Sequence, residues 1–130
     1  MIFSGKRPDN LGVKNRQLAL CPGSPNCVSS QNDSEKHSIE PFHFNGDPVE
    51  EMDRLKKLLS NMKGVTIIMS RDDYIYAECK TPIMGFVDDL EFYWESESKV
   101  CHVRSASRLG YRDFGVNRAR VEEIRKSFNQ

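Results

Sequence analysis

Two neighbouring segments near the C-terminus alternate in polarity, and they constrain the fold more than any other feature of the sequence. In residues 86–95 the even positions are mostly large and apolar, and the odd positions are mostly polar. This pattern is typical of a strand with one buried face. Residues 99–108 form the second segment, and residues 96–98 between them are suited to a tight turn. The two segments therefore predict a β-hairpin.

The requirement for matching faces determines the register of this hairpin. A slip of one residue would move every side chain of one strand to the opposite face. With a tight turn at residues 97–98, Leu90 lies opposite Ser105 and Asp88 lies opposite Ser107. The inner face is therefore apolar near the turn and becomes polar at the far end of the hairpin.

On the outer face the same register predicts a ladder of ion pairs. Glu91 lies opposite Arg104, and Asp89 lies diagonally between Arg104 and Arg108. Opposite charges that face each other across strands contribute roughly 0.2–1 kcal/mol per pair. We therefore interpret Asp89, Glu91, Arg104 and Arg108 as structural ion pairs that stabilise the sheet.

The inner face carries a carboxylate, Asp88, where an apolar core residue is expected. A carboxylate there must find hydrogen-bond donors or reach a water-filled pocket. The register brings Asp88 close to Ser105 and Ser107, and to the start of a last helix at Asn117 and Arg118. Because a cation in the first helical turn opposes the macrodipole, we expect Arg118 to bind a carboxylate such as Asp88. These five residues form a candidate pocket, which either fixes the fold or binds a small anion.

A strong helix start precedes the strands. Asp47 can cap the helix, Pro48 suits the first helical position, and Glu50 occupies the acceptor position of a capping box. Gly64 can end this helix in the left-handed conformation. Apolar residues recur at helical spacing between these ends, at Val49, Met52, Leu55, Leu59 and Met62.

The remaining elements complete an α+β fold. Residues 65–70 and 73–81 predict a second hairpin, and residues 39–44 predict a short edge strand. A second helix is expected over residues 117–128, capped by Asp113 or by its own first residue. We therefore predict a four- to five-stranded antiparallel sheet with two helices packed on one face.

Residues 1–38 are rich in Gly, Pro, Asn and Ser and show neither strand nor helix periodicity. They predict an irregular N-terminal arm with a polar linker, followed by a single α+β domain over residues 39–130. Four apolar residues can hold the arm against this domain: Leu11, Val13, Leu18 and Leu20.

Two cysteines, Cys21 and Cys27, enclose the passage CPGSPNC. Their spacing is wider than that of the usual zinc-binding pairs, and no second Cys/His pair follows, so neither a metal nor another cofactor is expected. Because no export signal is visible, we expect the thiols to be reduced. A disulfide that closes a small loop is the alternative.

Composition excludes several classes of partner. The net charge is zero, so nothing global favours binding to nucleic acid. No apolar run reaches the length of a membrane span, and no secretory signal is visible. We therefore expect a cytoplasmic protein whose partner is a small anion or another protein. The oligomeric state is not indicated.

Three segments together resemble the family catalogued as domain of unknown function 1499. They are CPGSPNCVSS (21–30), GFVDDLEF (85–92) and VRSASRLGYRDFGVNRARVEEIR (103–125), and the opening FSGKRPDNLGV (3–13) is also similar. The resemblance implies no established activity, and some members carry export or plastid-targeting segments. The positions that mark the family correspond here to Cys21, Asn26, Cys27, Asp88, Asp89, Arg104, Ser105, Ser107, Arg108, Gly110, Asn117 and Arg118.

These features predict a non-enzymatic binding or accessory module, with a polar pocket at the sheet end beneath residues 21–30. The pocket would bind a small anion or a partner's carboxylate. One alternative is a small hydrolase- or isomerase-like enzyme that uses Asp88 as acid or base beside Ser105 or Ser107. Another is a structural interaction domain. No nucleophile elbow, phosphate-binding glycine loop or metalloprotease helix motif is visible, which favours a role without catalysis.

Overall fold

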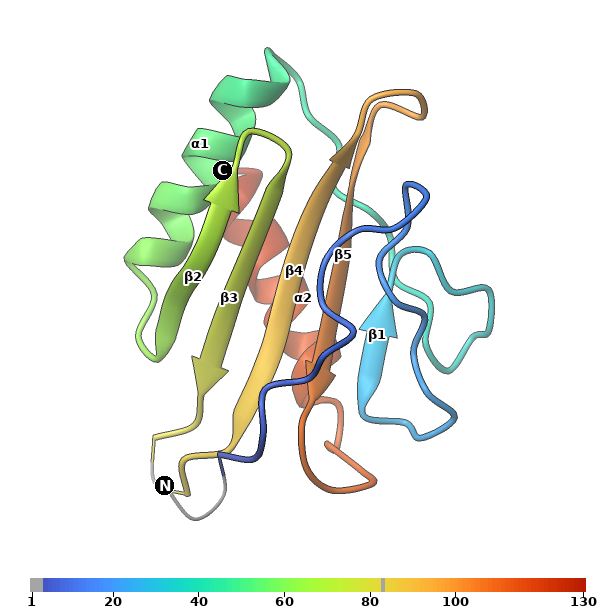
Figure 1. Cartoon of the computed structure of the whole chain (residues 1–130). Coiled ribbons are helices and arrows are strands. Elements are labelled where there is room, and N and C mark those ends of the chain that lie inside the picture. The colour runs from blue at the N-terminus through green and yellow to red at the C-terminus, as the bar shows by residue number, and fades with distance from the viewer. Residues whose placement is uncertain (1–3, 83) are drawn as a thin grey trace.

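A five-stranded antiparallel sheet carries both helices on one face (Figure 1). The computed structural model describes residues 4–82 and 84–130. The elements in chain order are β1 (Cys27–Ser29), α1 (Pro48–Ser60), β2 (Val65–Arg71), β3 (Tyr74–Lys80), β4 (Val87–Glu95), β5 (Val100–Ser107) and α2 (Val116–Phe128). The strands lie in the order β1-β5-β4-β3-β2. The predicted α+β class, both hairpins and both helices are confirmed.

The central hairpin has the predicted register. Asp88 lies opposite Ser107, and Glu91 lies opposite Arg104. Alternate residues of β4 and β5 therefore face the helices, and the residues between them face the opposite side of the sheet. This division places two sets of polar side chains on two different faces.

The main hydrophobic core lies between the sheet and the helices. α1 begins as predicted, with the Asp47 carboxylate accepting a hydrogen bond from the backbone N–H of Glu50 at 3.1 Å. Val49, which was predicted to begin its apolar stripe, is 49% exposed. The buried residues of the two helices are Met52, Leu55 and Leu59 from α1, and Asn117, Val121, Ile124 and Phe128 from α2.

Residues 39–44 do not form the predicted edge strand. Phe42 forms only an isolated bridge, exchanging two backbone hydrogen bonds with Cys101. Pro41 has no N–H to donate, which limits further pairing of this segment. The ring of Phe42 packs in the core, 5.3 Å from that of Phe92. The fifth strand is instead β1, which lies within the segment predicted to be irregular.

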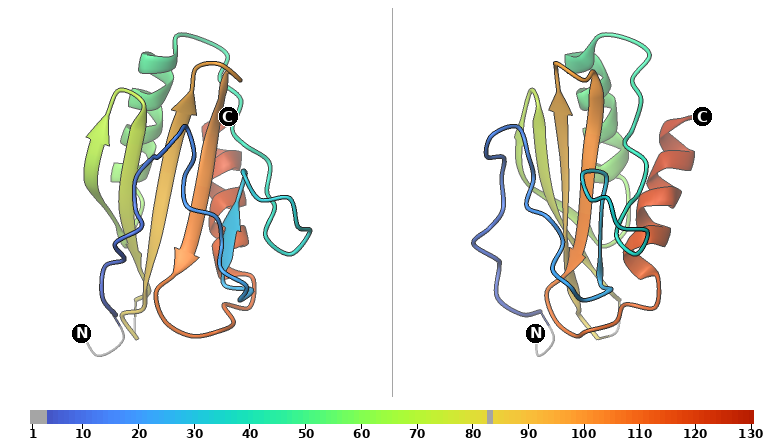
Figure 2. Two further views of the ribbon diagram at one scale, coloured as in Figure 1. Left: turned by 45° about the vertical axis from the view of Figure 1, so that its right-hand side comes forward. Right: turned by 90° about the vertical axis from the view of Figure 1, so that its right-hand side faces the viewer.

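The other face of the sheet is covered by the N-terminal arm (Figures 1 and 2). Leu18 is buried there, and Leu11 and Val13 are partly buried, against tyrosines of β3 and β4. Leu20 is 57% exposed and does not hold the arm as predicted, because it lies outside this apolar cluster. One face of the sheet thus carries the helices, and irregular chain covers part of the other face, while β2 stays largely exposed.

α2 begins at Val116, one residue earlier than predicted. Gly115 occupies the N-cap position in the left-handed conformation, with φ 82°. The Asp113 carboxylate accepts hydrogen bonds from the backbone N–H groups of Gly115 and Asn117, at 2.9 and 3.1 Å. Asp113 therefore satisfies free donors of the first turn.

We expect Gly64→Ala to lower the free energy of unfolding by about 2 kcal/mol, because Gly64 has φ +81° and left-handed backbone is strained for other residues. A Cβ there would also lie 2.7 Å from the carbonyl oxygen of Lys80. Urea denaturation measures the change. Gly46→Ala is the matched control, since a Cβ at Gly46 would have no atom within 4 Å. Equal losses in the two variants would contradict this account.

Candidate functional site

Two polar clusters lie back to back on β4 and β5, one on each face of the sheet. The helix-side cluster consists of Asp88, Ser105, Ser107, Asn117 and Arg120. The arm-side cluster consists of Tyr76, Glu78, Asp89, Glu91, Arg104 and Arg108.

Asn117 is the centre of the helix-side cluster and is fully buried. Its Oδ1 accepts a hydrogen bond from the Ser105 hydroxyl at 2.6 Å. Its Nδ2 donates to the Ser107 hydroxyl and to the Asp113 carboxylate, both at 2.8 Å. One amide therefore joins β5 to the turn that begins α2.

Asp88 is held by an arginine of α2. Its Oδ2 accepts a hydrogen bond from Arg120 Nη2 at 2.6 Å. Arg120 Nη1 donates to Ser105 Oγ at 3.1 Å and to Asn117 Oδ1 at 2.9 Å. The buried side-chain polar atoms of this cluster all have partners within the described part of the chain. This arrangement supports the structural interpretation of Asp88.

Arg118 does not join the candidate pocket. Its guanidinium donates to the backbone carbonyls of Ser38 and Lys36, at 2.8 and 3.3 Å. Arg118 and Arg120 are separated by about 200° around the helix axis, because an α-helix turns once every 3.6 residues. The expectation that Arg118 binds Asp88 is therefore wrong. The spacing of three residues from Asn117 was the signal that could have identified Arg120.

The two cysteines of the arm, Cys21 and Cys27, form a disulfide with their Cα atoms 5.6 Å apart. The expectation of reduced thiols is therefore wrong, and the alternative that the sequence left open, a disulfide that closes a small loop, is present. Within the closed loop, the Asn26 side chain donates to the carbonyl of Gly110 at 2.6 Å. The Asn26 carbonyl accepts from Asn117 Nδ2 at 3.2 Å. The disulfide loop is thus attached both to the helix-side cluster and to the loop after β5.

Arg108 is the centre of the arm-side cluster and forms close ion pairs with Asp89 and Glu78. Two guanidinium nitrogens of Arg108 bind the two Asp89 oxygens, both at 2.9 Å. Arg108 Nη2 also binds Glu78 at 2.6 Å, and the Tyr76 hydroxyl donates to Asp89 at 2.5 Å. The hydrogen bonds that Arg108 donates to Asp89 raise the pKa of Arg108 above its ordinary value. The predicted ladder was placed on an outer face, but the arm covers Asp89, which is only 2% exposed.

The second predicted pair, Glu91 with Arg104, is loose. Both side chains are buried, yet the shortest distance between their charged atoms, Arg104 Nη1 to Glu91 Oε1, is 3.9 Å. Glu91 Oε2 already accepts hydrogen bonds from the Tyr74 hydroxyl at 2.5 Å and from the backbone N–H of Gly12 at 2.8 Å. Arg104 Nε and Glu91 Oε1 have no hydrogen-bond partner within residues 4–82 and 84–130.

Burial changes the charge balance of this pair. It raises the pKa of Glu91, which favours the neutral form of the carboxyl. It also lowers the pKa of Arg104, but a guanidinium remains protonated throughout the physiological range. The Arg104 guanidinium is therefore buried without a closer carboxylate among the described residues than Glu91 at 3.9 Å.

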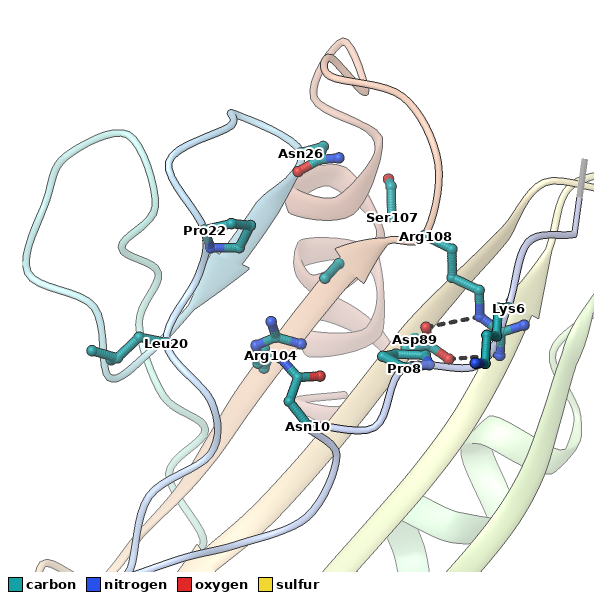
Figure 3. Close-up of a pocket in the computed structure, with 11 residues that line it drawn as sticks. Lys6, Pro8, Asn10, Leu20, Pro22, Asn26, Asp89, Arg104, Ser107 and Arg108 are labelled. Atoms are coloured by element: carbon teal, nitrogen blue, oxygen red, sulfur yellow. Dashed lines mark hydrogen bonds and ion pairs between the residues drawn. The ribbon is translucent and has the colours of Figure 1, made fainter.

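Arg104 lines a pocket of about 280 Å³ between the arm and the sheet. Figure 3 shows its side chain beside Asn10 of the arm, with Leu20 on one side and the Asp89–Arg108 pair on the other. The charged residues of the lining are Lys6, Asp89, Arg104 and Arg108, so bases outnumber acids. The remaining lining residues are Pro8, Asn10, Leu20, Pro22, Asn26, Ala106 and Ser107.

The described histidines near these clusters have structural partners. His37 Nδ1 lies 3.0 Å from the carbonyl oxygen of Cys27, and His102 Nδ1 lies 2.9 Å from the Ser30 hydroxyl. Among residues 4–82 and 84–130, no group of three or more His, Cys, Asp or Glu residues could hold a metal ion.

We expect Asp88→Asn to lower the free energy of unfolding by about 2 kcal/mol, because it leaves the Arg120 guanidinium without its carboxylate in a largely buried position. Glu122→Gln is the matched control. It breaks the pair of Glu122 with Arg125 on α2, where half of the Glu122 side chain is exposed, and should cost less than about 1 kcal/mol. Urea denaturation at neutral pH compares the two. A loss in Asp88→Asn no larger than in the control would remove the structural role of Asp88.

A family model described as "Protein of unknown function (DUF1499)" matches residues 17–128. The match begins in the arm and extends to the last residue of α2, so it includes both polar clusters and the disulfide loop. Searches of curated proteins and of solved structures found no match. The chain belongs to the DUF1499 family.

Proposed function

We propose that the protein is a non-enzymatic binding module whose pocket between the arm and the sheet binds a small oxyanion, either a carboxylate or a phosphate. The proposal depends on one observation, the burial of the Arg104 side chain without a close acceptor. This side chain is 4% exposed and lines the pocket, and its guanidinium is 3.9 Å from the nearest carboxylate oxygen.

A buried cation without a close partner is costly. An oxyanion offsets that cost, because the planar guanidinium matches the geometry of a carboxylate or phosphate and can donate two parallel hydrogen bonds. Arg104 Nε already lacks an acceptor among the described residues. A bound oxyanion would supply one.

The other bases of the pocket suit supporting roles. Arg108 is committed to Asp89 and Glu78, so its donors are largely occupied. Lys6 is exposed and forms no ion pair with a described residue, so its ammonium group can add a second positive charge at the rim. Among the described lining residues Asp89 is the only acid, and Arg108 pairs with it.

The size and walls of the pocket favour a small organic anion. Its volume of about 280 Å³ is near the lower end of the range for ligand sites, roughly 300–1,000 Å³. Pro8, Leu20 and Pro22 supply apolar wall on the arm side. The pocket therefore suits an oxyanion that carries a short apolar part.

The helix-side cluster offers less support for the enzymatic alternative. Asp88 faces the helices, on the opposite side of the sheet from Arg104, and Arg120 binds its carboxylate. The Ser105 hydroxyl donates to the amide oxygen of Asn117 rather than to a base. We therefore place the function in the arm-side pocket.

Isothermal titration calorimetry with inorganic phosphate, acetate and benzoate, at low ionic strength, tests this proposal. We expect at least one of these anions to bind, and Arg104→Gln to weaken binding about tenfold or more, since a hydrogen bond to a charged group contributes on the order of 1.5–3 kcal/mol. The three anions distinguish phosphate from carboxylate and show whether an apolar part improves affinity.

Arg71→Gln is the control variant, because Arg71 is exposed at the end of β2 and does not line the pocket. It should bind as the wild type does, and thermal denaturation establishes that both variants are folded. Absence of binding by all three anions at millimolar concentration, or equal binding by Arg104→Gln, would refute the proposal.

A further inference from the structure

Exposed apolar side chains gather at one end of the molecule. Six of the ten large hydrophobic residues that are exposed in the described part of the chain lie just before β4 or between β5 and the start of α2. We name these six the loop end; they are Met84, Phe86, Leu109, Tyr111, Phe114 and Val116.

The register of the central hairpin brings these residues together. Asp88 near the start of β4 pairs with Ser107 at the end of β5, so the chain entering β4 lies beside the chain leaving β5. Figures 1 and 2 show both connections at the same end of the sheet, together with the start of the arm. A cavity of about 270 Å³ lies between them. Its apolar lining residues are Phe86, Val87, Leu109, Phe114 and Val116, and its polar ones are Thr81, Asp88, Ser107, Arg112 and Asp113.

Phe114 extends furthest into solvent, with 92% of its surface exposed. Hydrogen bonds on both sides of Phe114 fix the backbone of the loop that carries it. Gly110 is bound through its carbonyl by Asn26, and Asp113 binds the backbone at Gly115 and Asn117. Phe114 itself has φ 54°, in the left-handed region. The loop is therefore anchored on both sides of an aromatic side chain that contributes almost no buried area to the fold.

The charges around the loop end are mainly basic. Lys6, Lys80 and Arg112 are exposed, and none of them forms an ion pair within residues 4–82 and 84–130. Two acids nearby already have partners. Arg120 binds Asp88, and the Asp113 carboxylate accepts a hydrogen bond from the backbone N–H of Asn117 in the first turn of α2. An apolar tip with a basic rim complements a surface that is negatively charged at its face and apolar beneath.

We infer that the loop end docks on the surface of an anionic lipid bilayer. Phe114, Tyr111 and Leu109 enter the interface between headgroups and acyl chains, and the bases around them contact the headgroups. Tyrosine suits this position because its ring is apolar and its hydroxyl is polar. Neither helix in the described ranges is long and apolar enough to cross a bilayer.

A bilayer fits the shape of the loop end better than a second protein does. A side chain that protrudes as far as Phe114 needs a shaped cavity in a protein partner, whereas a fluid interface accommodates it without one. This inference does not depend on the anion pocket, because Arg104 lies outside the loop end and faces the arm.

Vesicle co-sedimentation of the full chain tests the inference. We expect binding to vesicles of mixed phosphatidylcholine and phosphatidylglycerol, and much weaker binding to phosphatidylcholine alone. Phe114→Ser should weaken binding about tenfold, since it removes a large apolar side chain from the interface. Arg112→Glu should weaken it by about fivefold or more, because one basic residue near an anionic surface contributes on the order of that factor.

Val49→Ser is the matched control, because Val49 is also an exposed apolar residue but lies in the first turn of α1, outside the loop end. Its binding should equal that of the wild type. In Phe114→Trp, brominated lipids should quench the new tryptophan, with the native Trp94 of the wild type as the background.

Absence of binding to the anionic vesicles, or equal binding by Phe114→Ser, would overturn the inference. Concentration-dependent self-association that Phe114→Ser abolishes, together with no vesicle binding, would assign the loop end to a protein interface instead. Arg104→Gln separates the two proposals, since it should reduce anion binding and leave vesicle binding unchanged.

Discussion

The pairing of β4 with β5 is the constraint on which both polar clusters depend. A strand sends alternate side chains to opposite faces, so the paired register sorts a mixed run of acids, serines and arginines into two sets. One set meets the buried amide of Asn117 beneath α2. The other set lies on the face of the sheet that the N-terminal arm covers. A slip of one residue would exchange the sets and place arginines in the hydrophobic core.

The arm-side face shows why two similar ion pairs differ. Arg108 and Asp89 form two parallel hydrogen bonds, which is the strongest arrangement for this kind of pair. In Glu91, by contrast, Oε2 accepts hydrogen bonds from the Tyr74 hydroxyl and from the backbone N–H of Gly12. Arg104 Nη1 lies 3.9 Å from the other oxygen, Glu91 Oε1. The two hydrogen bonds thus offset the cost of burying the first pair, whereas the second pair has no such bond. This difference is the reason why we propose Arg104, and not Arg108, as the ligand-binding side chain.

Local patterns predicted most of the fold. The alternation in residues 86–108 was sufficient for the hairpin and its register, and the helices followed from their caps and periodicity. The part that was not predicted is non-local. Periodicity shows that a strand has two faces but not what covers the second one, so charges that the arm buries were interpreted as a surface ladder. The short pairing of β1 with β5 likewise has no periodic signal. The error of choosing Arg118 instead of Arg120 could have been avoided from the sequence alone. The helical repeat of 3.6 residues brings Arg120, three residues after Asn117, close to that side chain.

Asn26 connects the features to which function is assigned. Its backbone carbonyl binds Asn117 of the helix-side cluster, and its side chain binds Gly110 in the loop that carries Phe114. The same residue lines the pocket of Arg104. The disulfide between Cys21 and Cys27 closes the loop that contains it, which restricts how far it can move. Asn26 therefore connects the wall of the proposed anion pocket to the base of the loop end.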